Sequence, residues 1–170
     1  MKLKALAIAV LLLVTGLGAG LQSEEEALNT IRARYRLIRE ALPFCNQRTV
    51  DIEDQSTEGG QATAYLAAGE LQMIALELLG ETGKWEWEFY FDRDRLIFAL
   101  ARDFRYNRPF YWDAEKAREF EDTEVFDPEK SSISENRYYF QQERLFLWLD
   151  HDRKEVDLNL AENSAAGPGR

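Results

Sequence analysis

The sequence YFDRDRL at Tyr90–Leu96 is the most informative segment for the fold, because the chain contains three versions of it. YLAAGEL occupies Tyr65–Leu71, and YFQQERL occupies Tyr139–Leu145. Each version has two large residues, four intervening residues and a leucine. The copies begin 25 and 49 residues apart, close to one and two periods of a single unit. We interpret them as one repeated structural unit.

The unit has the spacing of a β-hairpin. If the four intervening residues form the turn and its closing pair, the residue before them lies opposite the leucine. Opposed residues share a face of the sheet and contact each other directly. The expected pairs are Leu66–Leu71, Phe91–Leu96 and Phe140–Leu145. A further hairpin is expected around Gly80–Gly83, so the strands form an antiparallel meander.

The stretch Trp85–Phe91 (WEWEFYF) predicts which face is buried. Its odd positions are all aromatic, and two of its even positions are glutamates. This pattern predicts that Phe91 points into the core and Tyr90 to the opposite face. The returning strands then carry apolar residues on the opposite face as well, and this makes that face the candidate binding surface. Its candidate residues are Tyr65, Tyr90, Ile97, Tyr139, Phe146 and Trp148, next to Ile74, Leu76 and Leu78.

The second apolar face has two interpretations. Residues 105–131 interrupt the meander with a turn, a short helix that Asp113 caps and an acidic stretch. We favour the interpretation that this insertion folds over the face. The alternative is that the face is free to bind a partner, since large apolar patches are seldom left bare.

A helix precedes the sheet. Ser23 and Glu26 form a capping box, an apolar stripe runs from Leu28 to Leu42, and Pro43 ends the helix. We therefore expect an α+β fold in which a helix at 23–42 packs on a twisted antiparallel β-meander. The sheet should span about 49–104 and 132–149, within a single domain at 21–152. A disordered tail is expected at 153–170.

The repeated phrases also support a resemblance. YLAAGEL, YFDRDRL and YFQQERL resemble the hairpin repeats of MORN-variant proteins. The segments STEGG (Ser56–Gly60), GETGK (Gly80–Lys84) and ENRYYF (Glu135–Phe140) are similar to those of uncharacterised exported bacterial β-hairpin-repeat proteins. The resemblance covers most of residues 24–150. It implies an α+β fold and an exported location, and it implies no activity.

Residues 1–20 have the features of a secretory signal peptide. Lys2 and Lys4 precede an apolar run of ten residues, Ala5–Val14, which is short for a membrane span, and small residues follow. The alternative is a retained membrane anchor. Cleavage would leave 19 basic and 31 acidic side chains, a net charge of −12. We expect a periplasmic or extracellular protein without a lipid anchor or membrane insertion, and a surface that repels nucleic acid.

The sequence offers little catalytic chemistry. His151 is the only histidine and Cys45 the only cysteine, and neither lies in a catalytic signature. We expect no metal and no cofactor. The leading hypothesis is an exported, non-enzymatic binding or envelope-associated module for an unknown protein or small ligand. One alternative is a glycan-acting enzyme that uses paired carboxylates. The other is a small protein inhibitor or a chaperone-like protein.

Overall fold

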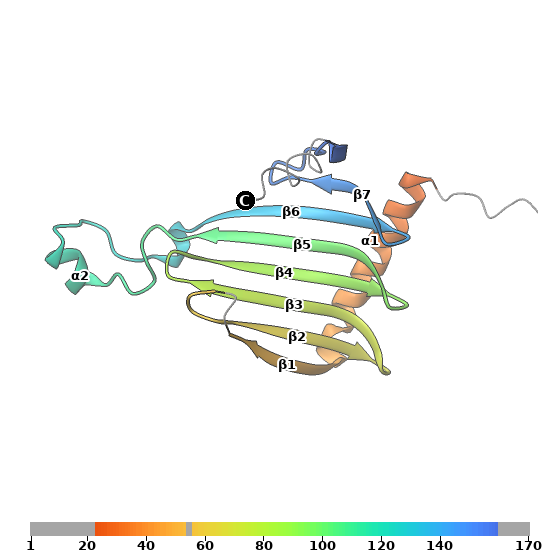
Figure 1. The fold of residues 1–170 in the computed structure, drawn as a ribbon, viewed down its shortest axis with the longest axis horizontal. Coiled ribbons are helices and arrows are strands. Elements are labelled where there is room, and N and C mark those ends of the chain that lie inside the picture. The colour runs from red at the N-terminus through yellow and green to blue at the C-terminus, as the bar shows by residue number, and fades with distance from the viewer. Residues whose placement is uncertain (1–22, 54–55, 160–170) are drawn as a thin grey trace, which may run out of the picture.

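The computed structural model describes residues 23–53 and 56–159. They form a seven-stranded antiparallel sheet in which every strand pairs with its neighbour in sequence, and one long helix packs on the sheet (Figure 1). The helices are α1 (Glu24–Ala41) and α2 (Ala114–Glu119), with 3₁₀ turns η1 (Leu42–Phe44) and η2 (Pro128–Lys130). The strands are β1 (Asn46–Ile52), β2 (Gly60–Ala67), β3 (Glu70–Gly80), β4 (Gly83–Asp92), β5 (Arg95–Arg105), β6 (Ser132–Gln141) and β7 (Arg144–Leu149). The expected α+β meander is confirmed, and β1 starts three residues before the expected edge of the sheet.

Helix α1 begins at the predicted capping box. The Ser23 hydroxyl accepts a hydrogen bond from the Glu26 amide at 3.2 Å, and the Ser23 amide donates to the Glu26 carboxylate at 3.3 Å. Ile31 and Ile38 of the apolar stripe are buried against the sheet. The helix contacts β4, β5 and β6, so it covers the middle of one sheet face.

The three repeats form hairpins of the same geometry. The expected pairs are confirmed, because Leu66 lies opposite Leu71, Phe91 opposite Leu96 and Phe140 opposite Leu145. Both residues of each two-residue turn have positive φ, as a type I′ turn requires. These turn residues are Ala68 and Gly69, Arg93 and Asp94, and Gln142 and Glu143.

Each of the three repeat hairpins also contains a β-bulge, which follows the two residue pairs next to the turn. Between the pairs Tyr90–Phe98 and Phe91–Leu96, β5 has one extra residue, Ile97. Ile97 and Phe98 both pack into the core beneath α1. The equivalent extra residues are Gln72 in β3 and Phe146 in β7. A bulge places two consecutive side chains on one face, which simple alternation along the strand does not anticipate.

The predicted orientation of the sheet is wrong by one residue. Tyr90 is completely buried (0% exposed) beneath α1, and its ring packs edge-on against Tyr35 with centroids 4.8 Å apart. Phe91 lies on the opposite face, next to Phe89, because side chains alternate along β4. From the sequence alone, the glutamates of β4 indicate the solvent-facing side. In the structure α1 packs on the face that carries these glutamates, so the opposite face is the one left uncovered.

The face beneath α1 changes from apolar to charged along the strands. Near the repeated turns, its buried cluster includes Met73, Tyr90, Phe98 and Tyr139. Farther from these turns, one cross-strand row is entirely polar. This row consists of Asp51, Gln61, Glu77, Glu86, Arg102 and Glu135. Helix α1 therefore covers the apolar half of the face and leaves the charged half at the surface.

The insertion lies beyond one end of the sheet and does not fold over it, which corrects the interpretation favoured from the sequence (Figure 1). It is held against the β3–β4 turn by the Tyr106 amide, which donates to the Thr82 carbonyl at 2.9 Å, and by the Phe110 amide, which donates to the Glu81 carbonyl at 2.9 Å. Asp113 caps α2 as expected. In the described part of the chain, no helix lies on the face opposite α1.

The chain continues beside β7 after this strand ends. Glu155 forms a β-bridge with Leu149, and the Val156 amide donates to the Trp148 carbonyl at 2.9 Å. Backbone hydrogen bonds thus place residues 153–156, the start of the predicted disordered tail, beside β7. The predicted signal peptide and the end of the predicted tail lie outside the described residues. No helix within 23–53 or 56–159 is long and apolar enough to cross a bilayer.

Candidate functional site

The sheet face opposite α1 is the candidate site, and we call it the outer face. Three cross-strand rows define it. The first contains Arg48, Ala64, Ile74, Phe89, Ala99, Tyr138 and Trp148. The second contains Val50, Ala62, Leu76, Trp87, Ala101 and Asn136, and the third contains Ile52, Gly60, Leu78, Trp85, Asp103 and Ser134.

The outer face carries one of the six candidate residues from the sequence. Trp148 lies there, as predicted, and so do its expected neighbours in β3, Ile74, Leu76 and Leu78. The placement of the other five on this face is wrong. Tyr90 and Tyr139 are buried in the core, and Tyr65, Ile97 and Phe146 pack against that core. All five were misplaced because the predicted core face was reversed. The bulge at Phe146 shifts the alternation by one residue, and Trp148 was therefore placed correctly in spite of that reversal.

Four aromatic residues of β4 lie on the outer face, although sequence reasoning assigned them to the core. They are Trp85, Trp87, Phe89 and Phe91. Tyr138, also on the outer face, was not named as a candidate. The signal that could have placed them was the pair of consecutive apolar residues after two of the three repeat leucines, Ile97-Phe98 and Phe146-Leu147. Such a pair is typical of a bulge that turns both side chains toward one core.

The aromatic residues form a continuous run across four strands. Ring centroids are 5.5 Å apart for Phe89 and Trp87, 5.7 Å for Trp87 and Tyr138, and 5.4 Å for Tyr138 and Trp148. The run crosses β5, whose alanines Ala99 and Ala101 lie buried beneath it. Small side chains on β5 therefore allow rings from β4 and β6 to meet above it.

The rings of this run stand beside one another. The planes of Trp87 and Phe89 differ by 8°, and those of Trp87 and Tyr138 by 17°. Centroids this close with planes this parallel describe offset stacking, in which each ring covers part of its neighbour's face. Stacking therefore covers part of the ring faces of Trp87, Phe89 and Tyr138. A sugar that stacks on an aromatic ring needs a free ring face.

The outer face is partly open to solvent and nearly uncharged. Trp85 is 51% exposed and Val50 is 61% exposed. Arg48 and Asp103 are the only charged residues of the three rows. Burial among its neighbours raises the pKa of the Tyr138 hydroxyl. At the end nearest the insertion, an open hollow of about 800 Å³ lies beside Trp85 and Tyr106.

The carboxylates of the sheet gather on the face beneath α1. Glu88 accepts a hydrogen bond of 2.5 Å from the Tyr90 hydroxyl and lies 3.3 Å from a guanidinium nitrogen of Arg102. Glu86 pairs with Lys84 at 2.7 Å. Burial, followed by the bond to Glu88, raises the pKa of Tyr90 well above its usual range. These acids neutralise basic neighbours.

Other residues with catalytic potential lie apart from the outer face. His151 is exposed at a turn after β7, 3.7 Å from Asp152. The thiol of Cys45 is half-buried and donates a hydrogen bond to the Ala41 carbonyl at 3.5 Å. Across residues 23–53 and 56–159, no three acidic, histidine or cysteine side chains are grouped closely enough to hold a metal.

Comparison with known proteins gives no relative. No family model matches the chain, and neither a curated protein nor a solved structure is significantly similar to it.

Proposed function

We propose that this protein is an exported, non-enzymatic binding module that docks a partner protein through its outer face. The observation that carries the proposal is the composition of that face. It has one row of side chains over seven strands and two rows over six, with no described helix above them. These rows contain two charged residues, Arg48 and Asp103, and Asp103 pairs with Arg105 of the same strand at 3.4 Å. An antiparallel sheet normally turns polar on the side that faces water. An apolar second side is typical of a surface that binds another molecule.

The shape and charge of the outer face favour a protein as its partner. Small-molecule sites are concave and enclose most of their ligand, whereas this face is a broad sheet surface of up to seven strands. A chain of formal charge −10 is repelled by anionic lipid and by nucleic acid. A protein with an uncharged, apolar face would pair with it without leaving buried charges unpaired.

The outer face is large enough to dock a protein. Its rows extend about 29 Å across the strands and about 14 Å along them, from the usual spacings in a sheet. The resulting patch, roughly 400 Å², has the size at which exposed apolar surface is often functional. A standard interface buries about 800 Å² on each partner, so residues at the rim would supply the remainder.

Two charge substitutions test this proposal. In the double variant Val50→Glu/Trp85→Glu, both side chains are already exposed, so the fold should survive. Ile133→Glu is the matched control, because Ile133 is 58% exposed on the other face of the same sheet. Each protein would be crosslinked in its native envelope, and captured proteins would be identified by mass spectrometry. We expect one specific protein that is captured by wild type and Ile133→Glu and lost in the double variant.

Two results would change the conclusion. Equal capture by the double variant would exclude the outer face. Light scattering would show whether the partner is a second copy, through a dimer that the double variant dissociates. Promiscuous capture of many unfolded chains, lost in the same variant, would favour the chaperone-like alternative.

A further inference from the structure

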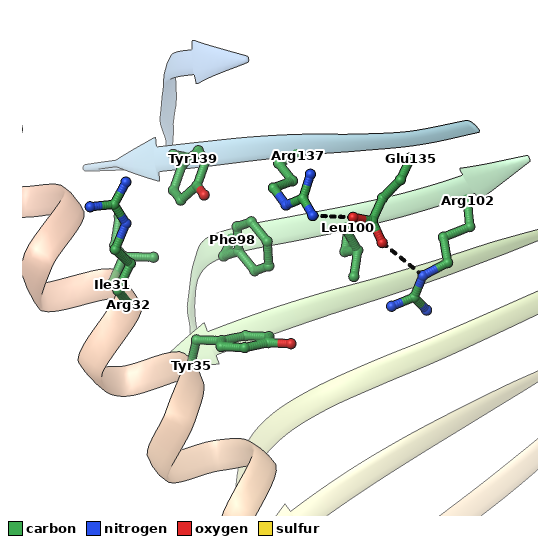
Figure 2. Close-up of a pocket in the computed structure, with 9 residues that line it drawn as sticks. All are labelled: Ile31, Arg32, Tyr35, Phe98, Leu100, Arg102, Glu135, Arg137 and Tyr139. Carbon is green, nitrogen blue, oxygen red and sulfur yellow. Dashed lines mark hydrogen bonds and ion pairs between the residues drawn. The ribbon is translucent and has the colours of Figure 1, made fainter. Parts of the chain in front are cut away.

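A cleft on the opposite side of the sheet lies between α1 and strands β5 and β6. Its volume is about 290 Å³, at the small end of the range for small-molecule sites. Phe98 and Leu100 form its apolar floor, and Ile31 and Tyr35 form its wall on the helix (Figure 2). Ile31, Phe98 and Leu100 are each less than a tenth exposed, so the floor belongs to the rigid core.

The rim of this cleft is basic. Arg32 approaches from α1, Arg102 from β5 and Arg137 from β6 (Figure 2). Among the described residues, Glu135 is the only acidic one that lines the cleft. Glu88 and Glu86 also approach Arg102, at 3.3 and 3.6 Å, so the three guanidinium groups do not contribute equally to the positive charge of the rim.

The three arginines differ in how far they are neutralised. Arg102 is 3.0 Å from Glu135 and 3.3 Å from Glu88, so its charge is balanced by the protein. Arg137 pairs with Glu135, which it shares with Arg102. In the described part of the chain, Arg32 has neither an ion pair nor a hydrogen bond. Arg32 and Arg137 therefore have donors left for a ligand.

The cleft also has polar groups among its aromatic residues. The rings of Phe98 and Tyr139 pack with centroids 5.0 Å apart, and those of Tyr35 and Phe98 with centroids 5.5 Å apart. Neither tyrosine hydroxyl has a hydrogen-bond partner among residues 23–53 and 56–159. A tyrosine at the mouth of a cleft offers an apolar ring and a hydroxyl that can donate.

We infer that this cleft binds a small carboxylate with an apolar body, such as an arylalkanoate. The apolar body lies on Phe98 and Leu100, where it replaces water on buried apolar surface. The carboxylate lies at the basic rim, where Arg32 and Arg137 donate charge-assisted hydrogen bonds. The site is on the face opposite the proposed docking surface, so it is an additional site with its own ligand.

A matched set of ligands tests the chemistry of this site. Phenylbutanoate, phenylbutanol and phenylbutylamine share one apolar body and differ in the charge of the head group. Binding to the purified chain would be measured by saturation-transfer NMR and isothermal titration calorimetry. We expect the acid to bind about tenfold more tightly than the alcohol, because of its charge-assisted bonds, and the amine to bind most weakly.

Two arginine variants test the position of the site. Arg32→Gln removes the unpaired guanidinium at the cleft, whereas Arg36→Gln removes an exposed guanidinium one turn along α1 that does not line it. We expect Arg32→Gln to lower the affinity for phenylbutanoate about tenfold and Arg36→Gln to leave it unchanged. Both variants should keep the melting temperature of wild type, since neither guanidinium is paired within the described residues.

Several outcomes would overturn the inference. These are equal affinity for acid, alcohol and amine, an equal effect of the two arginine variants, and no saturable binding of the acid. The Val50→Glu/Trp85→Glu variant separates this inference from the proposed function. It should lose the partner protein and still bind phenylbutanoate, so the two proposals can fail independently.

Discussion

The ring of Tyr90 packs edge-on against the ring of Tyr35, with centroids 4.8 Å apart and planes at 61°. This contact joins the second repeat to α1 and determines which face of the sheet is the core. Tyr139 of the third repeat has the same position on β6, where its ring packs against Phe98. The first residue of the repeated phrase is therefore the core anchor, and the second residue closes the hairpin on the outer face.

Truncation of Tyr90 tests this orientation. Tyr90→Ala should lower the free energy of unfolding by about 3–5 kcal/mol, because it opens a cavity under α1. Phe91→Ala is the matched control, since Phe91 is the next residue of β4 and is only partly buried on the outer face. We expect it to cost clearly less in denaturant melts. A larger loss for Phe91→Ala would reverse the assignment of the two faces.

Loss of the Glu88 carboxylate should also destabilise the protein. The Glu88 side chain is 16% exposed and binds the buried Tyr90 hydroxyl and Arg102. Glu88→Ala leaves both groups without this partner, and we expect a cost of about 1–3 kcal/mol. Glu40→Ala, at an exposed position on α1, should cost about 0.5 kcal/mol or less. Chemical denaturation of both variants measures the difference, and equal costs would contradict the role of Glu88.

The type I′ turns can be improved where they lack glycine. Arg93 and Asp94 both have positive φ, a conformation that costs roughly 1–2 kcal/mol per residue for most side chains. Arg93→Asn/Asp94→Gly should therefore raise the melting temperature. Gly69→Ala, at φ +87° in the first turn, should lower it. A rise in stability with Gly69→Ala would argue against this turn geometry.

Acid should loosen the insertion before the sheet. Arg108 binds both carboxylate oxygens of Asp122, at 2.6 and 3.0 Å. These bonds, with the Glu124 amide, hold the pKa of Asp122 well below its usual 3.8. Because the pKa of Asp122 is lower in the folded state than in the unfolded state, ionised Asp122 stabilises the folded insertion at pH values above the unfolded-state pKa. This stabilisation is lost as the pH falls below about 4. Limited proteolysis between pH 7 and pH 2 should show earlier cleavage of residues 106–126 in acid.

A substitution provides the control for that pH dependence. Asp122→Asn removes the titrating group, so cleavage of the insertion should already be increased at pH 7 and should change less with acid. An unchanged acid transition in Asp122→Asn would assign the effect to other carboxylates.

Export predicts a shortened natural chain. Lys2, Lys4 and the apolar run at Ala5–Val14 should direct secretion and cleavage near Leu21. Sequencing the N-terminus of the protein from its native source measures this directly. A retained Met1 would contradict both the signal peptide and the proposed exported location.

The sequence predicted the local elements well because their signals are short-range. Leu66 pairs with Leu71, Phe91 with Leu96 and Phe140 with Leu145, since a two-residue turn leaves few possible registers. The N-terminal cap of α1 at Ser23 could also be predicted, because a capping box involves only two residues that are three positions apart in the sequence.

Only part of the candidate site could be predicted from the sequence, because the polar side of β4 is the side that packs against α1. Trp85, Trp87 and Phe89 alternate with glutamates, and this pattern indicates which residues share a face but not which face is buried. Glu88 lies on the core side because Arg102 and Tyr90 satisfy it there. These partners come together only when the strands pair and α1 docks.

By itself, the sequence determined the helix, the strand order and the register of every repeated hairpin, because adjacent residues encode turns, caps and opposed pairs. The tertiary structure alone decided the rest. Packing of Tyr35 against Tyr90 determined which sheet face is the core. The bulges at Gln72, Ile97 and Phe146 shifted the alternation of side chains in β3, β5 and β7 by one residue. Once α1 had covered one side, the apolar outer face remained at the surface, because the insertion extends beyond the end of the sheet.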